Sequence, residues 1–179
     1  MEQDTRPFKP KASVMKDLYK ILLKEASEQQ NRSVQYAAAL RKQVNPDAVA
    51  ILKSTHLDLF EKIHCLECAN CCTTTPPIIN KQDITRIARF LKISPRQFTR
   101  KYVLTDVNEE MSFQRVPCVF LNDNNSCSIY EVRPEACRRY PHTDEESWFS
   151  RSSLNVKNTL ICPAAYMILN KIFESIISE

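Results

Sequence analysis

Glycine is absent from this chain of 179 residues. Phosphate-binding P-loops, dinucleotide-binding GxGxxG turns and the glycine-rich turn of Rossmann-type methyltransferases all need glycine, because the backbone must approach the ligand closely. None of these sites can therefore be present in its usual form. Tight turns must use Asn, Asp, Ser and Pro instead, and the Asn-rich run at 122–126 is typical of such a turn.

Long apolar runs are also missing. The longest of them, near Leu169, is interrupted within a few residues by Asn170 and Lys171, so no segment predicts a membrane span. The first residues, Met1–Asp4, are polar and acidic, whereas a secretory signal needs an apolar stretch. We therefore expect a cytoplasmic protein in a reducing compartment, with no membrane partner.

The excess of positive charge is small. The formal net charge of +4 counts every cysteine as neutral, although a metal-bound cysteine is a thiolate. Eight thiolates with two zinc ions would bring the net charge to about 0, and one [4Fe–4S] cluster on four thiolates to about +2. No block of Lys and Arg stands out along the sequence, so we expect no nucleic-acid partner.

Hydrophobic residues make up 43% of the chain, enough for a real core, and most recur at helical spacing. The pattern predicts helices over roughly 11–30 and 45–63, the second beginning at an Asn45 cap followed by Pro46. Further helices are expected after Asn80, after a capping box at Ser94, and over 163–177. Residues 116–121 and 127–130 flank the Asn-rich turn and predict a short β-hairpin.

The eight cysteines carry most of the chemical information. Four of them follow C-x2-C-x2-C-C within a short run, and the other four are single residues in the second half of the chain. A C-x2-C step lets two thiolates point at one ion. Three thiolates in C-x2-C-x2-C suit the corners of an iron–sulfur cluster, and ferredoxins add a Cys-Pro step like Cys162-Pro163. In chain order the cysteines are Cys65, Cys68, Cys71, Cys72, Cys118, Cys127, Cys137 and Cys162.

Buried or disulfide-bonded cysteines are the alternative to metal ligands. Four cysteines in so short a run are not a core pattern, and disulfides are disfavoured in a reducing compartment. Because the side chains of Cys71 and Cys72 diverge, these two should serve different metals or different corners of one cluster. All eight cysteines are therefore candidate metal ligands. Cys65, Cys68 and Cys71 come first, Cys162, Cys118 and Cys137 next, and Cys72 and Cys127 last.

The ordered set of motifs resembles one known family. The cysteine run is followed by PCVFL at 117–121, CSIY at 127–130, RPEACRRYP at 133–141 and Cys162-Pro163. This order is similar to that of the YkgJ-type CxxCxxCC cysteine-cluster family, a zinc- or iron-chelating domain, over roughly residues 63–165. The resemblance implies metal chelation. Flagellin lysine-N-methylases carry a related cysteine region, and resemblance to them implies an iron–sulfur centre serving methyl transfer.

We therefore expect a mainly α protein, a small helical domain with a short β-hairpin organised around a cysteine-ligated metal centre. Residues 1–62 are predicted to form a helical N-terminal extension, and residues 63–179 the cysteine-cluster domain with a C-terminal helix. The expected function is metal binding, by Zn²⁺ or a [4Fe–4S] cluster. Two alternatives stay open: an iron–sulfur enzyme component for methyl transfer or redox chemistry, and an interaction module. In the second, the N-terminal helices dock a protein partner and the metal only holds the fold.

Overall fold

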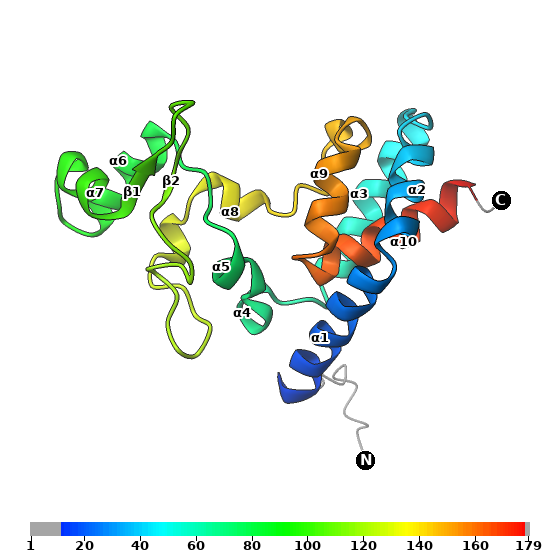
Figure 1. Cartoon of the computed structure of the whole chain (residues 1–179), viewed down its shortest axis with the longest axis horizontal. Coiled ribbons are helices and arrows are strands. Elements are labelled where there is room, and N and C mark those ends of the chain that lie inside the picture. The colour runs from blue at the N-terminus through cyan, green and yellow to red at the C-terminus, as the bar shows by residue number, and fades with distance from the viewer. Residues whose placement is uncertain (1–11, 178–179) are drawn as a thin grey trace, which may run out of the picture.

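A computed structural model describes residues 12–177 of the chain, and the fold over this range is mainly helical, as predicted (Figure 1). A single antiparallel pair of short strands accompanies the helices in this part of the chain. The elements in chain order are α1 (Ala12–Glu28), α2 (Gln30–Leu40), α3 (Pro46–Phe60), α4 (Cys65–Cys68), α5 (Asn70–Thr74), α6 (Lys81–Phe90), α7 (Pro95–Tyr102), β1 (Val103–Thr105), β2 (Met111–Phe113), η1 (Tyr130–Val132), α8 (Glu135–Arg139), η2 (Glu146–Ser150), α9 (Ser152–Thr159) and α10 (Pro163–Ile177).

The elements form two groups, which Figure 1 shows side by side. The helical lobe comprises residues 12–60 and 146–177, so it uses both ends of the described chain. The mixed lobe comprises residues 78–132 and holds α6, α7, both strands and η1. The short helices α4 and α5 lie between the two lobes, and α8 crosses from one lobe to the other on the return path (Figure 1).

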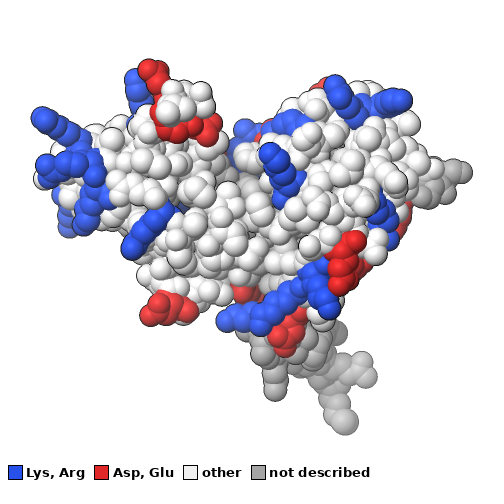
Figure 2. Space-filling model, in the orientation of Figure 1, with Lys and Arg blue, Asp and Glu red and all other residues white. Residues whose placement is uncertain are grey.

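Charge is distributed unevenly within the mixed lobe. Figure 2 shows Lys and Arg side chains gathered at the outer end of the mixed lobe, over α6 and α7. Residues 81–102 contain seven Lys or Arg residues and a single acid, Asp83. The overall charge of +4 therefore understates how basic this segment of the mixed lobe is.

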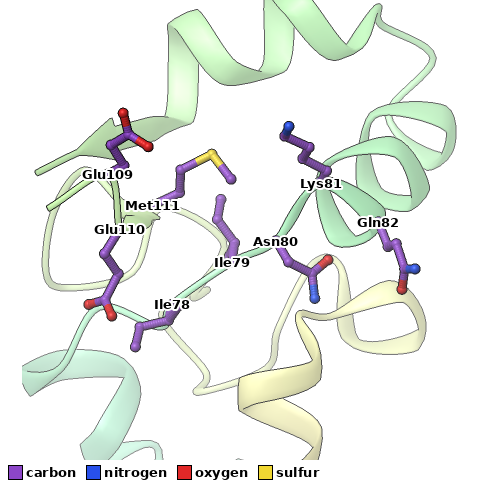
Figure 3. A pocket seen from close by; sticks show the side chains of 8 residues that line it. All are labelled: Ile78, Ile79, Asn80, Lys81, Gln82, Glu109, Glu110 and Met111. Carbon is purple, nitrogen blue, oxygen red and sulfur yellow. The ribbon is translucent and has the colours of Figure 1, made fainter.

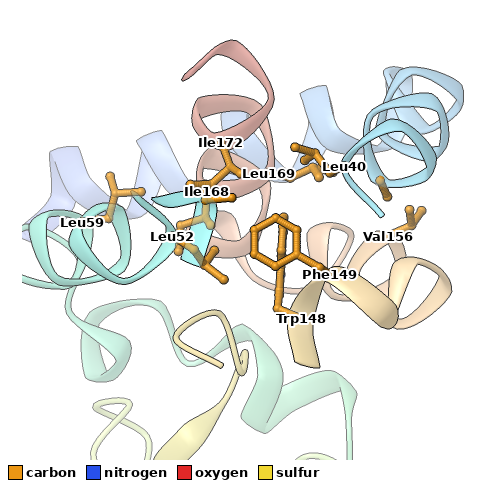
Figure 4. Close-up of a cluster of buried hydrophobic side chains, with 11 residues drawn as sticks. Leu40, Leu52, Leu59, Trp148, Phe149, Val156, Ile168, Leu169 and Ile172 are labelled. Atoms are coloured by element: carbon orange, nitrogen blue, oxygen red, sulfur yellow. The ribbon is translucent and has the colours of Figure 1, made fainter. Parts of the chain in front are cut away.

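The core of the helical lobe joins the two ends of the chain. Leu52 of α3 and Ile168, Leu169 and Ile172 of α10 are fully buried and belong to one cluster (Figure 4). Burying each such side chain stabilises the fold by roughly 1.5–3 kcal/mol. The division of the chain into domains at residue 62 stays a prediction. Because α3 and α10 share this cluster, the two predicted domains would share a hydrophobic interface.

Helix caps begin three helices where the sequence predicts them. The Asn45 side chain accepts a hydrogen bond from the Ala48 N–H at 2.9 Å, with Pro46 in the first turn. Capping boxes also begin α6, between Asn80 and Asp83, and α7, between Ser94 and Gln97. Each cap satisfies backbone N–H groups that have no partner inside the helix.

The predicted position of the β-hairpin is wrong. The two strands are Val103–Thr105 and Met111–Phe113, paired in register from Val103↔Phe113 to Thr105↔Met111. In the predicted segment only Leu121 and Cys127 pair, as an isolated bridge. The Asn-rich turn instead closes on its own side chains, and Phe120 and Ile129 are buried in the core of the mixed lobe.

No helix within residues 12–177 combines the length and apolar character that crossing a membrane requires.

Candidate metal centre

The eight cysteines come from four segments of the chain, and three of the helices that carry them, α4, α5 and α8, lie between the lobes (Figure 1). Four lie on α4 and α5, two on the loop between β2 and η1, one on α8, and one in the turn between α9 and α10. All eight are free thiols, so no disulfide links them. All eight predicted ligands are therefore available as thiols, and their role as metal ligands stays a prediction.

Ala69 separates α4 from α5. Its backbone is left-handed, with φ 49° and ψ 12°, a conformation that costs residues other than glycine about 1–2 kcal/mol. Its methyl group is buried, and its N–H donates to the Cys65 carbonyl at 2.8 Å. Because this turn ends α4 after Cys68 and a new helical turn begins before Cys71, the four cysteines do not follow one continuous helix.

The first part of the cysteine run lies against the helical lobe. The Asn70 side-chain amide donates to the Ile161 carbonyl at 2.7 Å, which fixes α5 beside the turn that carries Cys162. Cys68 and Cys162 pack against the same buried cluster, which includes Tyr19 and Ala164. Burial raises the pKa of the Cys162 thiol to about 12, and the charges of neighbouring thiolates in the run contribute to the rise.

The end of the cysteine run lies against the mixed lobe. The Cys118 N–H donates to the Cys72 carbonyl at 2.8 Å. Cys118 and Cys127 both pack against the core of the mixed lobe. Burial raises the pKa of the Cys137 thiol to about 12, the charges of Cys72, Cys118 and Cys127 raise it further, and Arg133 opposes the rise.

The adjacent pair Cys71 and Cys72 is electrostatically asymmetric. A side-chain hydrogen bond between the two thiols raises the pKa of Cys71 and lowers the pKa of Cys72 to about 7. The pKa of each of the other cysteines is raised, in each case mainly by burial. Cys72 is therefore the thiol most ready to ionise, although the sequence ranked it among the last candidates.

Two buried polar atoms beside the cysteines have no hydrogen-bond partner among the described residues. They are the hydroxyl oxygen of Tyr140 and a carboxylate oxygen, Oε2, of Glu67. Burial raises the pKa of Tyr140, and the charges of Cys162, Cys71 and Cys68 raise it further, so the phenol lies near these three thiols. Sequence reasoning missed both residues, because no spacing indicates where a phenol or a lone glutamate will point.

An ion-pair clamp holds the segment that leads to Cys137. Asp83 is buried on α6, and its Oδ1 accepts hydrogen bonds from the Arg86 guanidinium and from the Glu135 N–H. Arg86 also donates to the carbonyls of Val132 and Arg133. Helix α6 thereby fixes the start of α8.

A separate open pocket of about 540 Å³ lies where β2 meets the start of α6 (Figure 3). Its side chains include Lys81, Glu109 and Glu110 but no cysteine. The pocket is therefore not part of the cysteine site.

Comparison with known proteins decides the family. The sequence profile of the CxxCxxCC family, described as "Putative zinc- or iron-chelating domain", matches residues 64–163. The chain belongs to this family. All eight cysteines lie inside the CxxCxxCC match, which confirms the resemblance inferred from the motifs.

One relative also matches part of the chain. The uncharacterised protein MJ0661 of Methanocaldococcus jannaschii is 34% identical over 83 residues, which cover 45% of this chain and 44% of that protein. The match thus spans less than half of the relative's own length. No solved structure matches the chain significantly.

The donor chemistry of this CxxCxxCC protein fits zinc or iron, because free thiols are preferred ligands of both. The buried Tyr140 hydroxyl and Glu67 oxygen offer a further donor and acceptor beside the thiols. Within residues 12–177, however, no three Cys, His, Asp or Glu side chains converge closely enough to hold one ion.

Proposed function

We propose that this protein binds zinc or iron through its cysteine cluster. The observation that carries the proposal is that eight free cysteines lie on four chain segments, and that α4, α5 and α8, which carry five of them, lie between the two lobes (Figure 1). Membership of a family described as zinc- or iron-chelating supports it. Bound metal would stabilise the junction, because metal binding and folding are coupled when the ligands come from separate segments.

The first experiment is anaerobic purification without added metal, followed by elemental analysis and a visible spectrum of the same sample. About four or more irons per chain with broad absorption near roughly 400 nm would identify an iron–sulfur protein and favour the enzyme alternative. A colourless protein with zinc would favour a metal-holding or interaction module. A sample that holds neither metal and takes up neither one anaerobically would contradict the proposal.

The substitution Cys68→Ser tests whether the metal depends on the cysteine run. We expect lower metal content and a free energy of unfolding reduced by at least about 3 kcal/mol, since structural zinc contributes roughly 10–16 kcal/mol in zinc-finger peptides. Thr73→Ala is a matched control, because Thr73 is exposed on α5 and bonds only within its own helix. Unchanged metal content and melting temperature in Cys68→Ser would remove Cys68 from the ligand set.

A further inference from the structure

We propose that the eight cysteines form two separate four-thiolate metal centres rather than one shared site. The inference rests on the proposed function, and it adds the number of centres and the ligands of each. The helical-lobe centre comprises Cys65, Cys68, Cys71 and Cys162. The mixed-lobe centre comprises Cys72, Cys118, Cys127 and Cys137.

Hydrophobic packing assigns members to opposite sides of the junction. Cys68 and Cys162 pack against the buried cluster of Tyr19 and its neighbours in the helical lobe. Cys118 and Cys127 pack against a different cluster, the core of the mixed lobe. Each pair therefore packs against a different hydrophobic core.

Backbone geometry divides the chain between Cys71 and Cys72. The Asn70 amide bonds the Ile161 carbonyl, which holds the residue before Cys71 beside the turn of Cys162. The Cys72 carbonyl accepts from the Cys118 N–H, which holds the next residue beside the other group. Successive residues on a helix project about 100° apart, because a turn holds 3.6 residues. The neighbouring side chains of Cys71 and Cys72 can therefore bind metal in different centres, one beside each lobe.

Helix contacts place the two remaining cysteines. Helix α4, which carries Cys65, packs against α1 of the helical lobe. Helix α8, which carries Cys137, begins where Asp83 and Arg86 of the mixed lobe bond the backbone of residues 133–135.

Four thiolates are the complete ligand set both of a structural zinc ion and of a [4Fe–4S] cluster. The shared chemistry of the ligand is therefore a metal centre that accepts four thiolates. Eight cysteines can complete two such centres without using a histidine or a carboxylate.

The test compares metal content per chain in the wild type and in paired Cys→Ser variants, each reconstituted with zinc and, in parallel, with cobalt. Wild type is expected to bind about two zinc ions per chain (or, if isolated with iron, about eight irons). Cys162→Ser and Cys137→Ser should each retain about half of the metal, and the double variant should lose nearly all of it. Thiolate-to-cobalt absorption should fall by the same fractions.

Cys71→Ser and Cys72→Ser supply the sharper comparison, because the two residues are adjacent. Combining Cys71→Ser with Cys162→Ser should remove no more metal than either alone, whereas combining Cys72→Ser with Cys162→Ser should remove both centres. Fluorescence of the buried Trp148, the single tryptophan of the chain, checks that the helical lobe of each variant is folded. If a Cys162 or Cys137 variant fails this check, Cys65→Ser or Cys127→Ser replaces it.

The outcomes separate the two proposals. About one zinc or four irons per wild-type chain, or loss of all metal from either single variant, would overturn the division while leaving metal binding intact. Absence of metal from reconstituted wild type would overturn the proposed function itself. Half-loss in each single variant, with additive loss only across the two groups, would establish two centres.

Discussion

Polar side chains around the cysteines differ in whether their buried atoms have hydrogen-bond partners. The Tyr140 hydroxyl is buried without a hydrogen-bond partner among the described residues, and it lies near thiols of the helical-lobe group. An unsatisfied buried hydroxyl costs about 1–3 kcal/mol. A thiolate held by a metal would accept a hydrogen bond from this phenol, as ligand atoms commonly do.

Tyr140→Phe should therefore act in opposite directions with and without metal. In the metal-free protein we expect the variant to be about 1 kcal/mol more stable, because the unsatisfied hydroxyl is removed. In the metal-loaded protein this gain should vanish or reverse, since a hydrogen bond to a thiolate is lost. Urea unfolding of both forms measures the difference, with Tyr130→Phe at an exposed site as the control. An equal change in the free energy of unfolding in both forms would show that Tyr140 does not interact with the metal site.

Glu145 is the hub of a second set of polar contacts. Its carboxylate receives hydrogen bonds from His142, at 3.0 Å, and Ser147, and it pairs with Arg139 and Arg151. Burial alone would raise the pKa of Glu145, but the two side-chain hydrogen bonds and the two arginines outweigh it and lower the pKa. The contacts tie the segment after α8 to the start of α9.

This lowered pKa predicts the sign of a pH effect. Because the folded pKa lies below the unfolded value of about 4.5, the stabilisation is fully present above pH 4.5 and is lost as the pH falls through the folded pKa. Glu145→Gln should lower the free energy of unfolding by about 1–2 kcal/mol at pH 7, and by progressively less as the pH falls through the folded pKa. Thermal unfolding at pH 7 and over a series of acidic pH values measures this. Glu146, which is exposed, provides the control. An equal loss of stability in Glu146→Gln would exclude a specific stabilising role for Glu145.

Among the secondary-structure elements, those with strong local signals were predicted and those set by tertiary contacts were not. The caps at Asn45, Asn80 and Ser94 begin helices at the expected positions. Helix α9 was not predicted, because its buried face includes the polar residues Asn155 and Asn158. These amides bond to carbonyls of Trp148 and Pro141, partners that periodicity cannot reveal.

The hairpin shows the same limit. Its closing turn uses Asp106, whose side chain accepts from the N–H groups of Asn108 and Glu110. The sequence at this turn has no Asn-Gly or Asp-Gly step, which is the strongest local hairpin signal. The Asn-rich run at 122–126 is a stronger turn signal than residues 106–110, so the hairpin was predicted around the wrong loop.

Helix α6 carries a prediction about the mixed-lobe group. Arg86→Ala removes the cation from Asp83 and two hydrogen bonds to the segment before α8. We expect a loss of about 2 kcal/mol, less than the ~3–5 of a fully buried pair because Arg86 is 35% exposed. Metal affinity should also fall, through looser placement of Cys137. Arg89→Ala, exposed on the same helix, should change neither quantity; an equal loss there would refute the clamp.

At the scale of the whole molecule, the junction between the lobes, formed by α4 and α5, has the least stability of its own. Helices α4 and α5 have four and five residues, far too short to be stable on their own. Neither contains a buried residue, and Leu66 is 39% exposed. The helical lobe, by contrast, has a continuous core built from both ends of the chain.

Limited proteolysis should therefore depend on metal. Chymotrypsin, which needs no metal and cuts after aromatic residues and leucine, should cleave chelator-treated protein at Leu66 and spare metal-loaded protein, because local opening of α4 is easy without metal. The two fragments should stay associated on native gel filtration, since α2 and α3 pack against α9 and α10. Mass spectrometry locates the cut. Cleavage at the same rate in both forms would show that metal does not stabilise the junction.

The sequence by itself determined the helical class, the principal caps and the family, because capping, periodicity and cysteine spacing are local properties. It also named all eight candidate ligands, since only the order of Cys65 to Cys162 was needed. Tertiary structure alone decided that helices from both ends share one core, and that Asn70 and Cys72 on α5 bond to segments of different lobes. These features depend on contacts between segments far apart in the chain, such as Asn70 with Ile161 and Cys72 with Cys118. Such contacts leave no periodic signature in the sequence.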